Sequence, residues 1–199
     1  RSLLERYREV GEERLWENFA AFLEKVIPAA EDAGIRMAIH PDDPPWGVFG
    51  LPRIITGEES YRRMLSINDS KANGITFCTG SLGANPENDL PKLAAEFCEY
   101  IPFVHLRNIK ITGYRCFEES PHPSACGSLD MYAIVRALIA GGFDGYVRPD
   151  HGRMIWGEKG RPGYGLYDRA LGAAYITGLC EAALWEAAEK ELSVCKKPQ

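Results

Sequence analysis

Short apolar segments alternate with amphipathic segments along the 199-residue chain. Hydrophobic side chains recur at helical spacing in the segments that we expect to form helices, residues 12–33, 58–68, 88–100, 128–140 and 167–191. Between them lie four apolar runs without strict polar alternation, residues 35–40, 74–80, 101–108 and 145–152. Runs of this length and character are typical of parallel strands that are buried on both faces.

This order of segments predicts an α/β protein. Alternating helices and strands favour βα units and a parallel sheet. About four such units fit into one domain of residues 1–199. The long connections at residues 109–127 and 151–166 are rich in glycine, proline and polar residues, and we expect functional loops there. Asn88 and Ser128 are expected to cap the helices that follow them.

Composition and charge exclude several classes of protein. The net charge is −5, and acidic and basic residues are mixed along the chain, so we expect no nucleic-acid partner. The sequence contains no run of 18 apolar residues, so no membrane span is predicted. The charged N-terminal segment lacks the apolar core of a signal peptide. The six cysteines form neither a CxxC pair nor a compact disulfide pattern, which favours reduced thiols and a cytoplasmic location.

Chemically active side chains lie at or near the ends of all four expected strands. His40 ends the first strand, Cys78 lies near the end of the second, His105 lies in the third and Asp150 ends the fourth. The carboxyl ends of parallel strands meet on one face, where α/β enzymes place their active sites. Two imidazoles, a thiolate and a carboxylate suit a divalent metal ion, with zinc, iron and manganese all compatible.

Each of these four residues also has an ordinary structural explanation. A single histidine at a strand end is more often a satisfied polar residue than a ligand, and a cysteine in a strand is usually a small core residue. The intervals of 38, 27 and 45 residues between the four positions fit successive βα units and do not fit a zinc finger. It is therefore the combination that predicts a metal site.

Other polar side chains follow the same strand ends. An arginine there could bind a carboxylate through two hydrogen bonds, although a surface ion pair explains it equally well. The substrate contacts that we predict are Arg107, Arg148, Asp42, Ser81 and His122. His151 and Tyr164 are candidate proton-transfer groups because both could lie beside a metal-bound substrate. The alternatives are a solvated loop histidine and a packed loop tyrosine.

Seven motifs, in this order, resemble the C-terminal portion of the mannonate dehydratase family. They are ENFAAFLEKVIPAAEDAGIRMAIHPDDPP, LPRI, ANGITFCTGSLG, FVHLRN, SLDMY, RPDHG and PGYG. The resemblance implies a TIM-type (β/α)8 barrel of the xylose-isomerase-like kind, of which this chain holds the C-terminal half. It also implies dehydration of D-mannonate to 2-keto-3-deoxy-D-gluconate in the breakdown of hexuronates such as glucuronate.

The same resemblance implies a cofactor and roles for individual residues. The cofactor is a divalent metal ion, usually Mn²⁺, with Fe²⁺, Co²⁺ and Zn²⁺ as alternatives. Its implied ligands are His40, Cys78, His105 and Asp150. His151 and Tyr164 match the family's acid–base positions. A base removes the C2 proton and an acid assists the departing C3 hydroxyl, while the metal stabilises negative charge. Either residue could take either role; we prefer His151 as the acid and Tyr164 as the base.

The number of strands limits what the chain can form alone. A closed barrel needs eight strands and this sequence predicts four. A half barrel would expose strand edges and apolar surface. We therefore expect the missing strands to come from further residues of a longer protein or from another chain, as in a homodimer. Two other functions stay open, namely a metal-dependent sugar isomerase or epimerase and a non-catalytic half barrel that binds a sugar acid or a partner.

Overall fold

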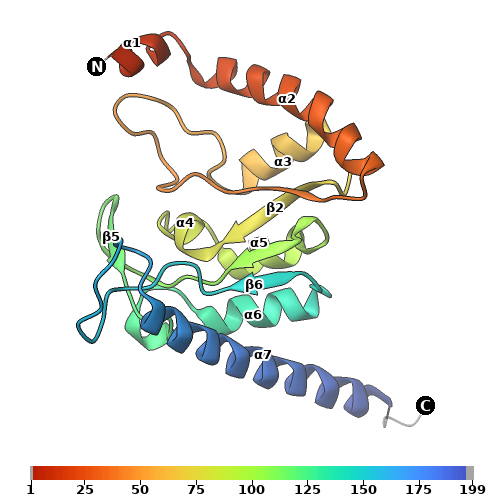
Figure 1. Ribbon diagram of the computed structural model, residues 1–199. Helices are drawn as coiled ribbons and strands as arrows, with labels where there is room; N and C mark the ends of the chain where they lie inside the picture. Colours follow the sequence, from red (N-terminus) through yellow and green to blue (C-terminus); the bar gives the residue numbers. More distant parts are fainter. Residues whose placement is uncertain (1, 196–199) are drawn as a thin grey trace.

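A four-stranded parallel sheet forms the centre of the protein (Figure 1). The computed structural model describes the backbone of residues 2–195 and the side chains of residues 4–189. The strands are β1 (Met37–Ile39), β2 (Asn73–Cys78), β3 (Phe103–His105) and β6 (Tyr146–Arg148). Their order in the sheet is β1–β2–β3–β6, and all three neighbouring pairs are parallel. This order along the chain is the one that successive βα units predict.

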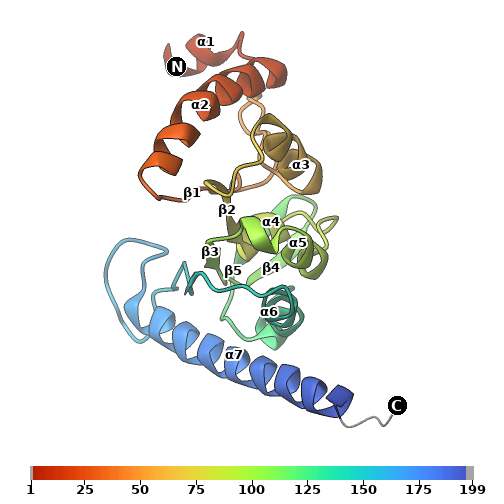
Figure 2. The ribbon, with the colours of Figure 1, turned by 90° about the vertical axis from the view of Figure 1, so that its right-hand side faces the viewer.

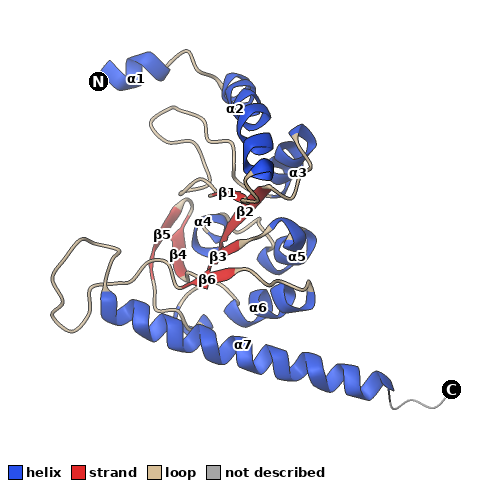
Figure 3. Ribbon diagram, turned by 45° about the vertical axis from the view of Figure 1, so that its right-hand side comes forward, coloured by secondary structure: helices blue, strands red, loops and turns tan. Residues whose placement is uncertain are grey.

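Helices connect the strands and cover one side of the sheet. They are α1 (Ser2–Tyr7), α2 (Glu12–Asp32), α3 (Glu58–Ile67), α4 (Thr79–Gly83), α5 (Leu90–Glu96), α6 (Met131–Ala140) and α7 (Leu166–Cys195), with short 3-10 turns at Cys98–Tyr100 and Ser124–Cys126. Figure 3 shows α3, α5 and α6 on the same side of the strands, with α2 and α7 at the two ends of the sheet. No helix in the described part of the chain has the length and apolar character to cross a membrane.

The opposite side of the sheet is partly uncovered. In Figure 2 the strands lie between α3, α5 and α6 on one side and, on the other, a region that no described helix fills. Tyr146 and Val147 of β6 are 82% and 38% exposed, and Met37 of β1 is 38% exposed. Parallel sheets are normally covered on both faces, so this exposure is what half of a barrel would show.

The core lies between the sheet and the covering helices. Every residue of β2 is buried, and Ile75 and Phe77 are completely inaccessible. They belong to one hydrophobic cluster with Met64 of α3, Leu93 of α5 and Ile134 of α6. This packing holds β2 in place, and Cys78, the last residue of β2, is held in place with it.

The region at residues 109–127 contains a β-hairpin, and the prediction of a loop there was wrong. Strands β4 (Ile109–Gly113) and β5 (Cys116–Glu119) pair antiparallel. In β5 the exposed Cys116 and Glu118 alternate with the half-buried Phe117 and Glu119. The sequence CFEE does not alternate in polarity, and glycine and polar residues surround it, so the sequence pattern does not indicate a strand here. The hairpin extends from the end of β3 and brings β5 to the predicted site.

Both predicted helix caps lie one or two residues from the true ones. Asp89 caps α5 and Asp130 caps α6, each through a carboxylate that accepts a backbone N–H of the first turn. Asn88 instead donates to the backbone carbonyl oxygens of Thr56 and Leu82, and Ser128 Oγ accepts from the backbone N of Ile111 in β4. Aspartate occupies both N-cap positions because the partial positive charge at a helix N-terminus favours an ionised acceptor.

An ion pair anchors the loop at residues 151–165 to the start of α7. Asp168, in the first turn of α7, is 2% exposed and accepts hydrogen bonds from the backbone N, Nε and Nη2 of Arg153 at 2.8, 3.0 and 3.0 Å. Burial alone would raise the pKa of Asp168, but the hydrogen bonds from Arg153 outweigh it and the pKa is lowered. The carboxylate is therefore held in its ionised form.

Changing Asp168 to asparagine should destabilise the protein by about 1–3 kcal/mol, because a charged acceptor of three hydrogen bonds is lost. Since the folded-state pKa is lowered, this contribution is present above the ordinary aspartate pKa and is lost as the pH falls through the lowered value. Urea unfolding of the wild type and of Asp168→Asn at neutral and acidic pH measures both effects. The matched control is Asp69→Asn at an exposed aspartate; equal stability losses in the two variants would contradict the prediction.

Candidate metal centre and active site

Three potential metal ligands meet at the carboxyl ends of adjacent strands. His40 directly follows β1, Cys78 ends β2 and His105 ends β3. One ligand atom from each can be chosen so that all three lie within 4.8 Å of one another. The parallel register pairs Cys78 directly with His105, which explains why these two side chains converge. The structure thus brings together three residues that their positions near strand ends in the sequence predicted to converge.

The ring of His40 is oriented by the backbone next to it. Its Nδ1 lies 2.6 Å from the carbonyl oxygen of Pro41. A carbonyl oxygen only accepts, so Nδ1 donates its proton and Nε2 is left with a free lone pair. Histidines that bind metals are commonly held in this way through the ring nitrogen that does not face the metal.

Asp150 lies beside this group, two residues after β6. Its Oδ1 is 3.5 Å from His105 Nδ1, and its Oδ2 is 3.9 Å from Cys78 Sγ. Arg148, the register partner of His105, donates from Nη2 to Asp150 Oδ1 at 2.6 Å. Asp150 has a φ of 62°, in the left-handed region that costs of order 1 kcal/mol or more for a residue other than glycine. Residues held in this region cluster at functional sites.

Buried and unsatisfied nitrogen atoms make this group suitable for a cation. Both ring nitrogens of His105 are buried without a hydrogen-bond partner. Leaving a buried polar atom unpaired costs about 1–3 kcal/mol. Burial lowers the pKa of His105 although the charge of Asp150 acts in the opposite direction. The imidazole is therefore neutral, which is the form that binds metal ions.

The two acidic side chains are in different states. Burial raises the pKa of the Cys78 thiol to about 11, although Ser81 Oγ, 3.1 Å from the sulfur, lowers it. This thiol becomes a ligand when a cation takes the place of its proton. Burial would also raise the pKa of Asp150, but the positive charges that His105 and His151 carry when protonated, together with the charge of Arg148, outweigh it and lower that pKa. The site thus offers an ionised carboxylate beside two imidazoles and a thiol.

Arg107 is engaged by two carboxylates of the chain itself. It is 3% exposed; Nη1 donates to Asp43 Oδ2 at 2.6 Å, and Nε and Nη2 donate to Glu119 at 3.1 and 2.7 Å. Burial would lower the pKa of Arg107, but Asp43 and Glu119 outweigh it and raise that pKa. The structure places this arginine in an internal ion-pair network, and its contact with a substrate stays a prediction.

Asp42 and His122 bind backbone groups of nearby loops. Asp42 Oδ2 accepts hydrogen bonds from the backbone N of Ile54 and of Ile55 at 3.0 and 2.9 Å. His122 is 3% exposed, and its Nε2 lies 2.8 Å from the carbonyl oxygen of Pro149. In this structure the two side chains hold the loops that frame the strand ends. Their contact with a substrate also stays a prediction.

The two candidate proton-transfer residues differ in their surroundings. His151 Nδ1 lies 2.8 Å from Glu119 Oε1, and His151 Nε2 lies 3.9 Å from Asp150 Oδ2. Tyr164 is 50% exposed, and two arginine guanidinium groups lie over its ring. A parallel bridge between Gly152 and Tyr164 folds the loop at residues 151–165 back on itself. His151 is therefore at the site, while Tyr164 lies on the returning part of its loop.

Glu119 is the residue of this region that sequence reasoning missed. It lies on β5 of the hairpin and contacts both Arg107 and His151. The segment was interpreted as a loop, so no strand end pointed to it. The alternation of exposed and half-buried residues in β5 exists only in the folded protein, and the sequence CFEE does not alternate in polarity, so no signal along the chain marked Glu119.

Comparisons with known proteins identify relatives of this chain. Residues 1–191 match the D-mannonate dehydratase (UxuA) family. Mannonate dehydratase of Thermotoga petrophila is 57% identical over 192 residues, which are 96% of this chain and 52% of the relative. The crystal structure of mannonate dehydratase from Streptococcus suis serotype 2 aligns with a TM-score of 0.90 and 48% identity, covering 94% of this chain and 54% of that one.

A more distant structure shows the fold. A xylose isomerase-like TIM barrel protein from Mycobacterium smegmatis, crystallised in complex with magnesium, aligns with a TM-score of 0.62 and 17% identity over 88% of this chain and 54% of that one. The expected α/β fold is confirmed as one that matches part of a TIM barrel. The chain spans about half the length of the curated relatives that it matches. Because the family match covers nearly all of the sequence, the chain belongs to the D-mannonate dehydratase (UxuA) family.

Proposed function

We propose that the protein carrying this chain dehydrates D-mannonate to 2-keto-3-deoxy-D-gluconate. One observation carries the proposal: in a chain of this family, three potential metal ligands converge within 4.8 Å at the ends of consecutive parallel strands. Active sites of (β/α) barrels are built at this end of the strands. The family match gives the reaction, and the convergence of ligands supports the presence of its metal-dependent site in this half of the barrel.

The proposed metal site consists of His40, Cys78, His105 and Asp150. The unpartnered nitrogens of His105 and the ionised carboxylate of Asp150 support it. We propose Mn²⁺ as the resident ion, with Fe²⁺, Co²⁺ and Zn²⁺ as alternatives that the same donors accept. When bound, the ion supplies Lewis acidity that stabilises negative charge on the substrate oxygens.

The proton transfers are assigned to His151 and Tyr164. In this proposal the phenolate of Tyr164 accepts the C2 proton, and His151, protonated on both ring nitrogens for this step, donates its Nε2 proton to the departing C3 hydroxyl, which leaves as water. The resulting enol rearranges to the 2-keto acid. The position of His151 Nε2 on the Asp150 side of the ring supports its part. The proposed substrate contacts are Arg148, Ser81, Arg107, Asp42 and His122.

We also propose how the barrel is completed. The remaining strands would come from further residues of the same protein or from a partner chain, because the relatives are about twice as long and β6 leaves Tyr146 exposed. A homodimer is compatible with this arrangement. A cytoplasmic location is supported by the free thiols of Cys78, Cys98, Cys116, Cys126 and Cys180.

The test is turnover by the intact protein that carries this sequence. After incubation with Mn²⁺ and D-mannonate, we expect mass spectrometry to show loss of one water and NMR to show the 2-keto-3-deoxy product. A chelator should abolish turnover and added Mn²⁺ should restore it. The same protein should be offered a panel of ketoses and aldoses. Interconversion of those sugars without dehydration would favour the isomerase alternative, and binding of mannonate without any turnover would favour a non-catalytic module.

A further inference from the structure

A chain of charged contacts connects four segments around His151. Asp43 lies in the connection after β1, Arg107 follows β3, Glu119 ends β5 and His151 follows β6. Arg107 joins Asp43 to Glu119, and Glu119 joins Arg107 to His151 through Oε1, which lies 2.7 Å from Arg107 Nη2 and 2.8 Å from His151 Nδ1. These contacts span positions 43 to 151 of the sequence, so they exist only in the folded protein.

The side chain of Arg107 is tightly packed. Its side chain lies over Gly80 of α4, where an added Cβ would come within 2.6 Å of Arg107 Cδ. The same arginine is 3% exposed and uses Nε and Nη2 on the two oxygens of Glu119. A two-point contact of this kind fixes the plane of the carboxylate as well as its distance. Glu119 therefore reaches His151 in one defined orientation.

Glu119 is in its ionised form in this network. Burial would raise the pKa of Glu119, but the hydrogen bond from His151 and the charge of Arg107 outweigh it and lower that pKa. An ionised carboxylate only accepts hydrogen bonds. The nitrogen that faces it, His151 Nδ1, must then carry a proton. In the neutral imidazole this leaves Nε2, on the side of Asp150, as the nitrogen that can exchange a proton.

We infer that Glu119 is a positioning residue that holds His151 in the Nδ1–H tautomer and turns its Nε2 toward the metal-site side of the ring. Arg107 in turn holds Glu119. The inference rests on the proposed function for the importance of His151, but the geometry of the contact does not depend on the reaction. It gives the β4–β5 hairpin a purpose that the sequence did not indicate.

The tautomer of His151 tests this inference without measuring activity. The intact protein would be labelled with ¹⁵N-histidine and studied metal-free or with diamagnetic Zn²⁺, at a pH well above the ordinary histidine pKa of about 6.5. Long-range ¹H–¹⁵N correlations distinguish the two tautomers, and the signal that is missing in His151→Gln assigns the residue. We expect the Nδ1–H tautomer in the wild type. An Nε2–H tautomer there would overturn the inference, even if no variant of Glu119 folds.

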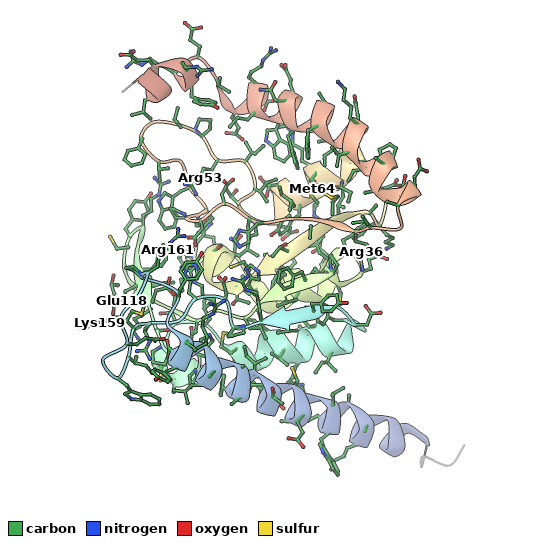
Figure 4. The ribbon with its side chains drawn as sticks, in the orientation of Figure 1. Arg36, Arg53, Met64, Glu118, Lys159 and Arg161 are labelled. Carbon is green, nitrogen blue, oxygen red and sulfur yellow. The ribbon has the colours of Figure 1, made fainter. Side chains whose placement is uncertain are left out.

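Variants at two positions of the hairpin distinguish loss of the contact between Glu119 and His151 from loss of a negative charge. Glu119→Ala should shift His151 toward the Nε2–H tautomer, which an unrestrained imidazole favours in water, and Glu119→Gln should keep Nδ1–H because its amide oxygen still accepts. The matched control is Glu118→Gln, since Glu118 is the exposed neighbour on β5 and points away from the sheet at the left of Figure 4. An unchanged tautomer in a folded Glu119→Ala variant would contradict the inference.

Kinetics give a second readout. Glu119→Ala should lower kcat for mannonate about 10–100-fold, the usual range for residues that orient a reacting or ligating group, with a much smaller change in KM. Glu118→Gln should leave both constants near their wild-type values. An equal loss of kcat in both variants would assign the effect to the charge of the hairpin and overturn the inference. If the wild type does not dehydrate mannonate, the proposed function fails, while the tautomer measurement still decides the role of Glu119.

Discussion

Replacing His40 with alanine should remove the bound metal ion from the intact protein and abolish dehydration of mannonate. His40 supplies one of the three converging ligand atoms, and its Nε2 is left free because Nδ1 donates to the Pro41 carbonyl. Mutation of a residue that only orients a ligand lowers metal affinity or activity about 10–100-fold. Removal of a ligand itself should therefore lower metal affinity more than about 100-fold. Elemental analysis of the purified variant, beside a titration with Mn²⁺, measures the loss directly.

The position of His40 makes this variant informative. His40 is exposed, whereas Cys78 and His105 are buried, so its removal should leave the core unchanged, and the unfolding transition should match that of the wild type when both proteins are compared without metal. Cys116→Ser is the matched control because it removes an exposed potential ligand that lies outside the group. Wild-type metal content in a folded His40→Ala protein would remove His40 from the metal site. The same measurement on Asp150→Ala tests whether the fourth residue is a ligand.

Replacing Tyr164 with phenylalanine should keep the metal and lose turnover. The change removes only the hydroxyl, and general acid–base groups contribute about 10²–10⁴-fold to the rate. The two guanidinium groups over the ring of Tyr164 should remain in place, because phenylalanine also offers a π face to a cation. Steady-state kinetics with mannonate should therefore show a large fall in kcat together with normal metal content.

Tyr114→Phe is the matched control for this prediction. Tyr114 lies between β4 and β5 and is 86% exposed, so its hydroxyl has no expected part in the reaction. Dehydration at the wild-type rate in Tyr164→Phe would remove Tyr164 from the mechanism and leave His151 as the remaining candidate for proton transfer. A similar fall in both tyrosine variants would indicate a general effect on the protein.

The strand ends show why part of the site could be predicted from sequence. A short apolar run that stops at a polar residue marks both a strand and its carboxyl end, and parallel pairing brings such ends together. His40 ends its predicted run, Cys78 lies near the end of the next and His105 lies within the third, and the structure places all three in one group. Asp150 follows β6 by two residues in a left-handed backbone conformation, and its carboxylate lies within 4 Å of Cys78 and His105.

The remaining contacts could not be predicted because they depend on long-range pairing. Glu119 is 32 positions from His151 and 12 from Arg107, and no periodicity along the chain relates these residues. For Arg107 the sequence leaves a substrate carboxylate and an ion pair equally open, and it does not show that Asp43 and Glu119 bind this guanidinium group. Figure 4 shows the two ends of the strands: Arg36 lies at one end, and the loop that carries Arg161 lies at the other.

Sequence by itself determined the parallel α/β architecture, the family resemblance and the polar residues near the carboxyl ends of the strands. These features are local, since they follow from hydrophobic periodicity and from motifs that are contiguous along the chain. The strands themselves end earlier than the predicted runs, at Ile39, Cys78, His105 and Arg148. Only the tertiary structure decided which polar side chains are free and which are already paired, and it revealed the hairpin that carries Glu119. A hydrogen bond or an ion pair needs two atoms within about 3 Å, and residues far apart in sequence reach that distance only after the chain has folded.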